Sequence, residues 1–523
     1  MKKILASIML LAGTITAMAT DYSGTLTVVI DGSMAQPTSN QITLDEQQDG
    51  KYGLTLRNFI LMQGGETMPI GNIVLQGIEA KDEQGKKLLE TKQDIEIGAG
   101  DIPGIPLWMG TMLGPVPVDL RAVVSGDGDI LTADIKIPLV GQDIQVMFDS
   151  RTFQLPNAGF EDFHTAKAGS VTSDEPNNWH SFMSCTGSLA SMVSSVPHTF
   201  VSEDVRPGSE GNKSVLLKSG TVSMLGGLVK VTANGTLTTG QLQAGGTSAT
   251  DTKNNAFMDF GNEAKDENGD PFYTVLNTLP DSISVWVKFK QGEAVESHPY
   301  ATMSAVITDG SYYQEPQDKD YGDIIVGEAR NNKIESTGEW QKITVPFEYA
   351  NEGKLPKGIL VTFSTNADPG EGTSNDELYL DDIELVYSSY LSDLSVNGET
   401  LPGFAPDKYE YEYNVSEEKT IDELVNSTIY AVAGNEAHGI VSVMDNAMTI
   451  VVLSADLLSS HTYTVKFIGG SSGEENGVQI VENDDNQGKT IYNMSGQKVS
   501  SMKDGEVYII KYTNGKTVKS INK

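Results

Sequence analysis

The segment 282–290 carries the side chains best suited to bind a ligand. It reads Ser-Ile-Ser-Val-Trp-Val-Lys-Phe-Lys, so apolar and polar side chains alternate along it. In a β-strand successive side chains point to opposite faces, which places Trp286 on the polar face beside Lys288. An exposed indole can stack on a pyranose ring, because its large flat face is apolar. The alternative is that a loop covers Trp286, or that both faces of its sheet are buried.

A second candidate for ligand contact is the acidic segment 311–323, which contains Tyr312, Tyr313 and Tyr321. Tyrosine in a polar loop offers a ring and a hydroxyl together, and it is common in binding loops. Such tyrosines also occur in loops that bind nothing. They therefore rank second to Trp286.

Motifs of known catalytic chemistry are missing from the sequence. It has no HExxH, nucleotide-phosphate loop, GxSxG or CxxC, and no two of its six His residues have a ligand-like helical spacing. His164 and His180 are interpreted as surface or loop residues. The single cysteine, Cys185, cannot form an intramolecular disulfide. We therefore predict no catalytic residue and no organic cofactor. A hydrolase that uses carboxylates stays an alternative, since 71 acidic residues will form pairs by chance.

The charge of the chain limits its partners. Lys and Arg number 36 against 71 Asp and Glu, which gives a formal net charge of −35. This field repels a phosphate backbone, so nucleic acid is not an expected partner, and anionic membrane surfaces are disfavoured for the same reason.

The N-terminus predicts export. Lys2 and Lys3 precede the apolar stretch 4–17, and Ala17-Met18-Ala19 is a small-x-small cleavage site. This pattern indicates a secretory signal peptide over 1–19 rather than a membrane anchor, because the stretch is short for a span of ~20 residues. No later stretch is long and apolar enough to span a membrane, so we expect the mature chain at the cell surface or outside the cell, with the periplasm as the alternative.

Short alternating segments separated by Gly, Asn, Asp and Pro predict an all-β protein of several units. This patterning favours sandwiches or barrels. The resemblances described below imply the finer fold, which is an N-terminal lipocalin-like barrel, a central jelly-roll sandwich, a small cadherin- or Ig-like sandwich and a short C-terminal β tail. The boundaries are placed at 20–150, 151–388, 389–469 and 488–523, with a Gly- and Ser-rich linker at 470–487.

The first unit resembles the calycin-like (lipocalin-like) domains of Bacteroidetes secreted proteins. The residues that carry the resemblance are Tyr22-Ser23-Gly24, Asp49-Gly50-Lys51-Tyr52, Leu56-Arg57-Asn58-Phe59 and Pro69-Ile70-Gly71-Asn72-Ile73. The apolar, proline-rich loop 102–117, which contains Trp108, is expected to plug a barrel mouth, because Leu107, Met109 and Leu113 would otherwise lie in water. The alternative is that this loop forms a binding lip.

The second unit resembles jelly-roll carbohydrate-binding modules and, more closely, the putative carbohydrate metabolism domain of Bacteroidetes surface proteins. Its motifs are Asn157-x-Gly159-Phe160-Glu161-Asp162, Glu175-Pro176-x-x-Trp179, Val285-Trp286-Val287-Lys288 and Asp381-Asp382-Ile383. The resemblance implies that the first and last strands lie close together, so Glu161, Asp381 and Asp382 would converge. Converging carboxylates repel one another without a cation, which makes them candidates for a structural Ca²⁺. The alternative is that they pair with backbone or solvent.

The last two units resemble the cadherin-like sandwich of bacterial surface proteins and the C-terminal sorting domain of the type IX secretion pathway. The carrying segments are 391–398, 401–411 and 461–467 for the sandwich, and 490–499 and 505–511 for the tail. Together these features predict an exported glycan-binding protein whose ligand is a glycan or polysaccharide held by the central unit. A hydrolase and a structural protein that assembles with surface partners are the alternatives.

Overall fold

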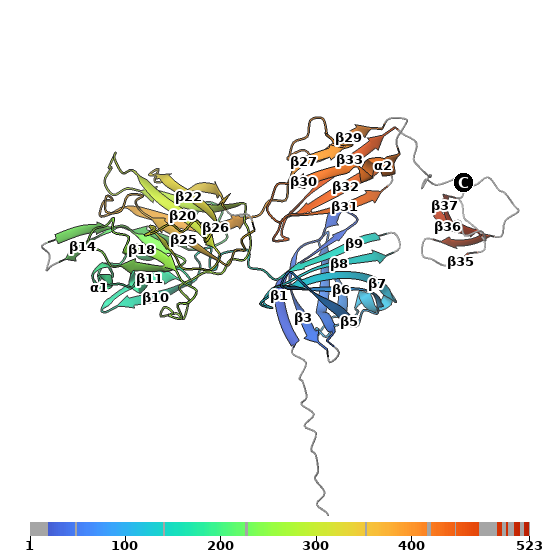
Figure 1. The fold of residues 1–523 in the computed structure, drawn as a ribbon, viewed down its shortest axis with the longest axis horizontal. Helices are drawn as coiled ribbons and strands as arrows, with labels where there is room; N and C mark the ends of the chain where they lie inside the picture. The colour runs from blue at the N-terminus through green and yellow to red at the C-terminus, as the bar shows by residue number, and fades with distance from the viewer. Residues whose placement is uncertain are drawn as a thin grey trace, which may run out of the picture.

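The structure is a computed structural model of the chain (Figure 1). It describes residues 19–47, 50–139, 142–224, 229–350, 353–415, 420–444, 446–469, 489–493, 498–499, 507–512 and 517–521, the last four ranges as backbone alone. The predicted signal peptide, apart from its final residue, and the predicted linker 470–487 lie outside these residues. The described elements are almost all strands, so the expected all-β class is confirmed.

The N-terminal unit is a closed antiparallel barrel of eight strands with the short β2 attached at one end (Figure 1). Strand β1 pairs with β3 on one side and with β9 on the other, so no long strand has a free edge. Inward-facing side chains such as Leu54, Leu75 and Leu89 are fully buried and form the core of the barrel. The strands are β1 Ala19–Ile30, β2 Ser33–Met34, β3 Thr38–Glu46, β4 Tyr52–Gln63, β5 Glu66–Glu83, β6 Lys86–Ile95, β7 Val116–Val124, β8 Leu131–Leu139 and β9 Gln142–Asp149.

The loop between β6 and β7 differs from the expected plug. Trp108 is buried, but Leu107 and Leu113 are 49% and 51% exposed. The Trp108 indole is covered because it packs against the backbone at Gly100. The expectation that the loop's aliphatic side chains are covered is therefore wrong.

The central unit is a sandwich of two five-stranded antiparallel sheets. Their orders are β12-β13-β26-β19-β23 and β16-β25-β20-β22-β24. Four alternate side chains of the strand 282–290 are fully buried between the sheets: Ile283, Val285, Val287 and Phe289. Trp286 lies outside this core. The alternation predicted for this strand is confirmed.

The strands of the two sheets are β12 Thr199–Ser202, β13 Ser214–Lys218, β16 Thr236–Thr238, β19 Ser282–Lys290, β20 Tyr300–Thr308, β22 Ile325–Glu335, β23 Gln341–Pro346, β24 Glu348–Tyr349, β25 Gly358–Ser364 and β26 Glu377–Val386. Smaller elements cover the sandwich: β10 Phe163–Ala168, β11 Val171–Pro176, η2 Phe182–Ser184, α1 Ala190–Val193, β14 Gly220–Met224, β15 Val229–Ala233, β17 Gln241–Ala244, β18 Asn254–Met258 and β21 Tyr313–Glu315.

The third unit is a small sandwich of two sheets, β28-β27-β30 and β29-β33-β32-β31. Its elements are β27 Leu391–Val396, β28 Glu399–Thr400, β29 Glu410–Asn414, α2 Ile421–Asn426, β30 Thr428–Val432, β31 His438–Met444, β32 Ala447–Leu453 and β33 Ser460–Ile468. It contacts the barrel through buried apolar side chains of Val29, Ile440, Val451, Leu453 and Leu457.

Polar contacts also join the units. Thr27 of the barrel donates a buried hydrogen bond of 2.7 Å to the Leu457 carbonyl of the third unit. Arg151, which follows the barrel, binds Asp149 and Glu436 at 2.8 Å each. The Asp281 carboxylate of the central unit accepts hydrogen bonds from the backbone of Ser388 and Asn435.

The C-terminal strands β34 Lys489–Asn493, β35 Lys498–Val499, β36 Val507–Tyr512 and β37 Thr517–Ile521 form one antiparallel sheet. Among the described residues, no helix has the length and apolar character needed to cross a bilayer.

Candidate functional site

A cleft of about 460 Å³ lies over the outer face of the sheet β16-β25-β20-β22-β24. Because side chains alternate along a strand, the residues next to buried core residues such as Met303 and Phe363 point out of the sandwich and form the cleft floor. The floor residues are mostly polar: Thr236, Thr302, Ser304, Arg330, Thr362 and Ser364. Small elements packed on the sheet supply an apolar wall, which includes Phe182, Met192, Val222, Val231 and Leu242. A volume of this size suits a small ligand.

Two hydrogen-bond acceptors in the cleft lining are unused. The side-chain oxygens of Asn234 and Asn255 are buried and have no hydrogen-bond partner within the described chain. Leaving a buried carbonyl without a donor costs about 1–3 kcal/mol, so both oxygens would gain from a donor. Because neighbouring atoms cover them, a ligand in the cleft would reach them only after adjacent side chains move.

The cleft floor also holds the charged side chain of Arg330, which is fixed by ion pairs. Arg330 forms ion pairs with Glu315 and, at 3.0 Å, with Glu328. Burial alone would lower the pKa of Arg330, but Glu315 raises it above the ordinary value, so the guanidinium stays charged. It is therefore a fixed donor at the edge of the cleft.

Trp286 lies on the other sheet, on the face that points away from the core. It is half-buried, and the Arg206 guanidinium lies over its ring at 5.5 Å from the centroid. The platform expected from the sequence is therefore partly covered by the segment that contains Arg206. This arrangement matches the alternative of a covering loop more closely than a fully open indole.

Lys288 is held close to the same face. Its ammonium lies 4.2 Å from the ring centroid of Tyr379 and 5.4 Å from that of Trp340, and it binds the Asp204 carboxylate. Burial would raise the pKa of Asp204, but hydrogen bonds from Lys288 and Trp340 hold it below the usual value. Lys288 thus has partners within the protein and is not a free cation awaiting a ligand.

Two of the three candidate tyrosines are core residues. Tyr313 is fully buried and Tyr321 is 3% exposed, and their rings contact each other edge to face. Strand β21 pairs with β18, which places these rings against Val306 and Leu360. The interpretation of Tyr313 and Tyr321 as exposed contact residues is therefore wrong. Tyr312 is 38% exposed and stacks on Phe257.

The three carboxylates expected to hold Ca²⁺ contact one segment, 206–213, but are not assembled around a common point. Glu161 accepts hydrogen bonds from the backbone of Asn212 and Lys213. Asp381 accepts one from the backbone of Arg206 at 2.9 Å, and Asp382 accepts one from its guanidinium at 2.5 Å.

The hydrogen bonds of these three carboxylates to segment 206–213 match the alternative in which they pair with the protein and not with a metal. The Arg206 guanidinium already supplies positive charge, which works against a second cation. One buried oxygen, Oδ1 of Asp381, has no partner within the described chain. Ca²⁺ at these residues stays a prediction.

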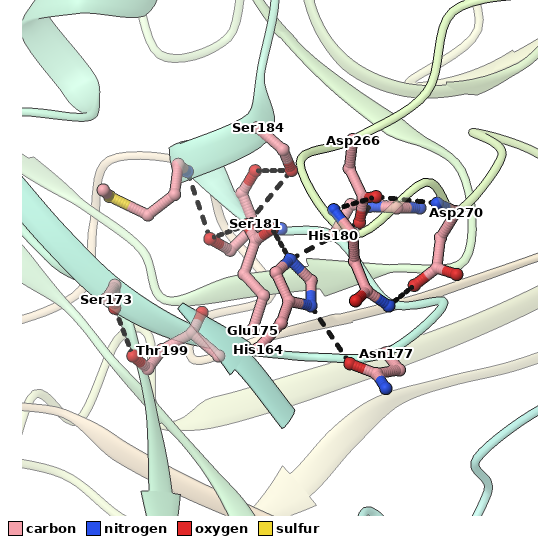
Figure 2. A network of polar contacts seen from close by, with 12 residues as sticks. His164, Ser173, Glu175, Asn177, His180, Ser181, Ser184, Thr199, Asp266 and Asp270 are labelled. Carbon is pink, nitrogen blue, oxygen red and sulfur yellow. Dashed lines mark hydrogen bonds and ion pairs between the residues drawn. The ribbon is translucent and has the colours of Figure 1, made fainter. Parts of the chain in front are cut away.

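A different polar cluster, which the sequence analysis did not identify, lies where the β10–β11 hairpin meets the segment before Phe182 and the 266–270 loop (Figure 2). His164, Glu175 and Asp266 bring ligand atoms within 4.8 Å of one another, and His180 lies 3.6 Å from Asp266. His180 is fully buried and the His164 side chain is 11% exposed, so their interpretation as surface or loop residues is wrong. Burial lowers the pKa of His180, which keeps its imidazole neutral.

Part of this cluster had a signal in the sequence. His164 and Glu175 lie directly opposite each other in the β10–β11 hairpin, whose turn is Gly169-Ser170. In a hairpin, residues equally distant from the turn face each other, so the position of this turn in the sequence pairs His164 with Glu175. Asp266 comes from a distant loop, and no local pattern brings it to the hairpin.

The match to known sequence families concerns the barrel. Residues 18–150 match the family described as calycin-like beta-barrel domain, and residues 19–149 form the closed eight-stranded barrel. The N-terminal unit is thus similar to calycin-like β-barrel domains in both sequence and fold. The family match ends where the calycin-like barrel ends, so it does not extend to the cleft or the polar cluster.

Two solved structures resemble larger parts of the chain. One, from Bacteroides thetaiotaomicron, is described as a putative glycoside hydrolase; it is 14% identical, with 64% of this chain and 87% of that chain covered and a TM-score of 0.31. The other, from Bacteroides fragilis, is described as a putative outer membrane protein; it is 12% identical, with 66% and 97% covered and a TM-score of 0.18. At these TM-scores neither likeness carries an argument. No curated protein matches the chain.

Proposed function

We propose that this chain is an exported cell-surface or secreted glycan-binding protein, and that the central sandwich holds the glycan in its cleft. The observation that carries the proposal is the cleft itself. It combines a polar floor, an apolar wall and the unpartnered side-chain oxygens of Asn234 and Asn255.

A sugar fits this combination because its surface has two characters. Hydroxyl groups around the ring edge are donors and acceptors, while the C–H groups on the ring faces are apolar. Hydroxyls would donate to the Asn234 and Asn255 oxygens and accept from the Arg330 guanidinium, and a ring face would lie against Phe182 or Leu242. A purely apolar ligand would leave both asparagine oxygens without a donor.

Binding without hydrolysis is favoured by the charges in the cleft. Among the described lining residues the only carboxylate is Glu315, and it is paired with Arg330. Glycoside hydrolysis commonly needs two carboxyl groups, one on each side of the scissile bond. We therefore propose that the chain is not an enzyme, and a hydrolase remains the second possibility to test.

The other units receive supporting roles in this proposal. The third unit contacts both the barrel and the central sandwich and acts as a spacer between them. The signal peptide directs export, and the C-terminal strands direct sorting through the type IX pathway.

The full chain can be tested on a glycan array. We expect retention of a small set of plant or host glycans, and no release of reducing sugar when these are incubated with the protein. Reducing-sugar release would favour the hydrolase. A protein that retains no glycan and has the solution mass of a stable oligomer would favour the surface-assembly alternative.

A further inference from the structure

Four side chains hold buried, unused ligand atoms in one polar cluster (Figure 2). The atoms are His164 Nε2, Glu175 Oε2, His180 Nδ1 and Asp266 Oδ2, and none has a hydrogen-bond partner within the described chain. Glu175 and His180 are fully buried, and the Asp266 side chain is 1% exposed. Buried polar atoms are normally hydrogen-bonded, so four unpartnered atoms at one place need an explanation.

The second polar atom of each imidazole is bound by the protein. His164 Nδ1 lies 3.1 Å from the Asn177 side-chain oxygen, and His180 Nε2 lies 3.2 Å from the Pro271 carbonyl. An oxygen acceptor fixes the proton on the nitrogen that faces it, so the other nitrogen presents a lone pair to the centre. Metal-binding histidines are oriented by such contacts in the same way.

The two carboxylates are oriented likewise. Glu175 Oε1 accepts hydrogen bonds from the Ser181 backbone at 2.7 Å, the Ser181 hydroxyl at 2.5 Å and the Ser184 hydroxyl at 3.1 Å. Asp266 Oδ1 accepts from the backbone of Asn268 and Asp270 at 2.9 and 2.8 Å. Each carboxylate therefore keeps one oxygen free, and that oxygen faces the imidazoles.

The distances between the free atoms fit a tetrahedral ion. His164 Nε2 lies 3.8 Å from Glu175 Oε2 and 3.5 Å from Asp266 Oδ2, and His180 Nδ1 lies 3.6 Å from Asp266 Oδ2. Ligands about 2.0–2.2 Å from a tetrahedral Zn²⁺ are about 3.3–3.6 Å apart, so the two distances from His164 fit an ion after a change of at most a few tenths of an ångström. The ligand atoms of His164, Glu175 and Asp266 all lie within 4.8 Å of one another, and His180 is outside this group. The same spacing is too long for direct hydrogen bonds.

We propose that His164, Glu175 and Asp266 bind one Zn²⁺ ion, with His180 beside Asp266 and outside the group of ligands. The imidazole ligand favours Zn²⁺ over Ca²⁺ or Mg²⁺, which prefer oxygen ligands. Three protein ligands leave one position of a tetrahedral ion for water. The ion would tie the β10–β11 hairpin to the 266–270 loop. This inference does not depend on the glycan proposal.

The rival explanation is that the cluster holds no metal. It predicts no bound ion after reloading and no response of the chain's stability to chelators, whereas metal binding predicts both.

The test is metal analysis of the full chain, purified without a histidine tag, stripped with chelator and reloaded with ZnCl₂. We expect one Zn²⁺ per chain, and at least a tenfold loss of affinity in Glu175→Gln and His164→Gln. His298→Gln is the matched control, because half-buried His298 also lies beside two carboxylates, Asp368 and Glu371, and the variant should keep full metal content.

Unchanged Zn²⁺ affinity in folded Glu175→Gln and His164→Gln would overturn the proposal. If these variants do not fold, the wild-type chain decides the question. Loaded with Co²⁺ it should show the visible absorption of a tetrahedral site with nitrogen and oxygen ligands, and Zn²⁺ should remove it. A stripped wild-type chain that binds neither ion would also refute the site.

Discussion

The buried carboxyl of Asp381 gives a prediction about how the free energy of unfolding changes with pH, and its magnitude follows from the surroundings of that carboxyl. The carboxyl is fully buried beside Trp286 in the pairing of β26 with β19, and burial raises its pKa from 3.8 to about 6. A backbone hydrogen bond from Arg206 offsets part of this increase, and the neighbouring Asp382 adds to it. Asp381→Asn replaces the acid by a neutral side chain of the same shape that can still accept from Arg206.

The direction of the pH effect follows from the two pKa values. The folded state holds the proton more tightly than the unfolded state, so this contribution to stability is fully present below about pH 4 and is lost as pH rises through about 6. Two pKa units correspond to at most about 3 kcal/mol. Asp381→Asn should therefore match the wild type near pH 4 and exceed its free energy of unfolding by up to about 3 kcal/mol at pH 7.

Urea unfolding of both proteins across this pH range, in the presence of chelator, measures the difference. The reasoning is refuted if the variant is no more stable than the wild type at pH 7, or if the difference between them does not change with pH. Repeating the series with added Ca²⁺ tests the ion expected at Glu161, Asp381 and Asp382. A bound ion would reverse the order at pH 7, because it requires an ionised Asp381.

Three other buried groups give measurable predictions. Arg151→Met leaves Asp149 without its cation and should destabilise the contact between barrel and third unit by about 3–5 kcal/mol, seen as a lower calorimetric midpoint; an unchanged midpoint would contradict it. Burial raises the pKa of Cys185 to about 12, so thiol reagents should label only unfolded protein. Trp179→Ala should cost about 3–5 kcal/mol in urea unfolding, because the indole is fully buried against Phe160.

The strand patterns were predictable because one physical rule decides them. A strand with one buried face must alternate, and 282–290 does so, which identified the core side of Ile283 and the outer side of Trp286. The same rule explains why the all-β class and the N-terminal barrel could be expected from the residues alone.

The errors arose where packing between distant segments decides the outcome. The polarity of 311–323 indicated exposed tyrosines, but pairing of β21 with β18 buries Tyr313. The cleft and the polar cluster each combine segments far apart in the chain, and Glu175 and Asp266 of the cluster are an example. No local periodicity encodes such contacts, so only the β10–β11 hairpin half of the cluster could have been found.

The most direct test of the glycan proposal is calorimetric titration of the best array glycan into the full chain and two variants. Asn255→Leu removes an unpartnered acceptor from the cleft, and Trp286→Ala removes the half-buried indole of the opposite sheet. Losing a buried hydrogen bond of about 1–3 kcal/mol predicts roughly tenfold weaker binding for Asn255→Leu and nearly unchanged binding for Trp286→Ala. Full affinity in Asn255→Leu together with lost binding in Trp286→Ala would place the glycan on the other sheet and contradict the proposal.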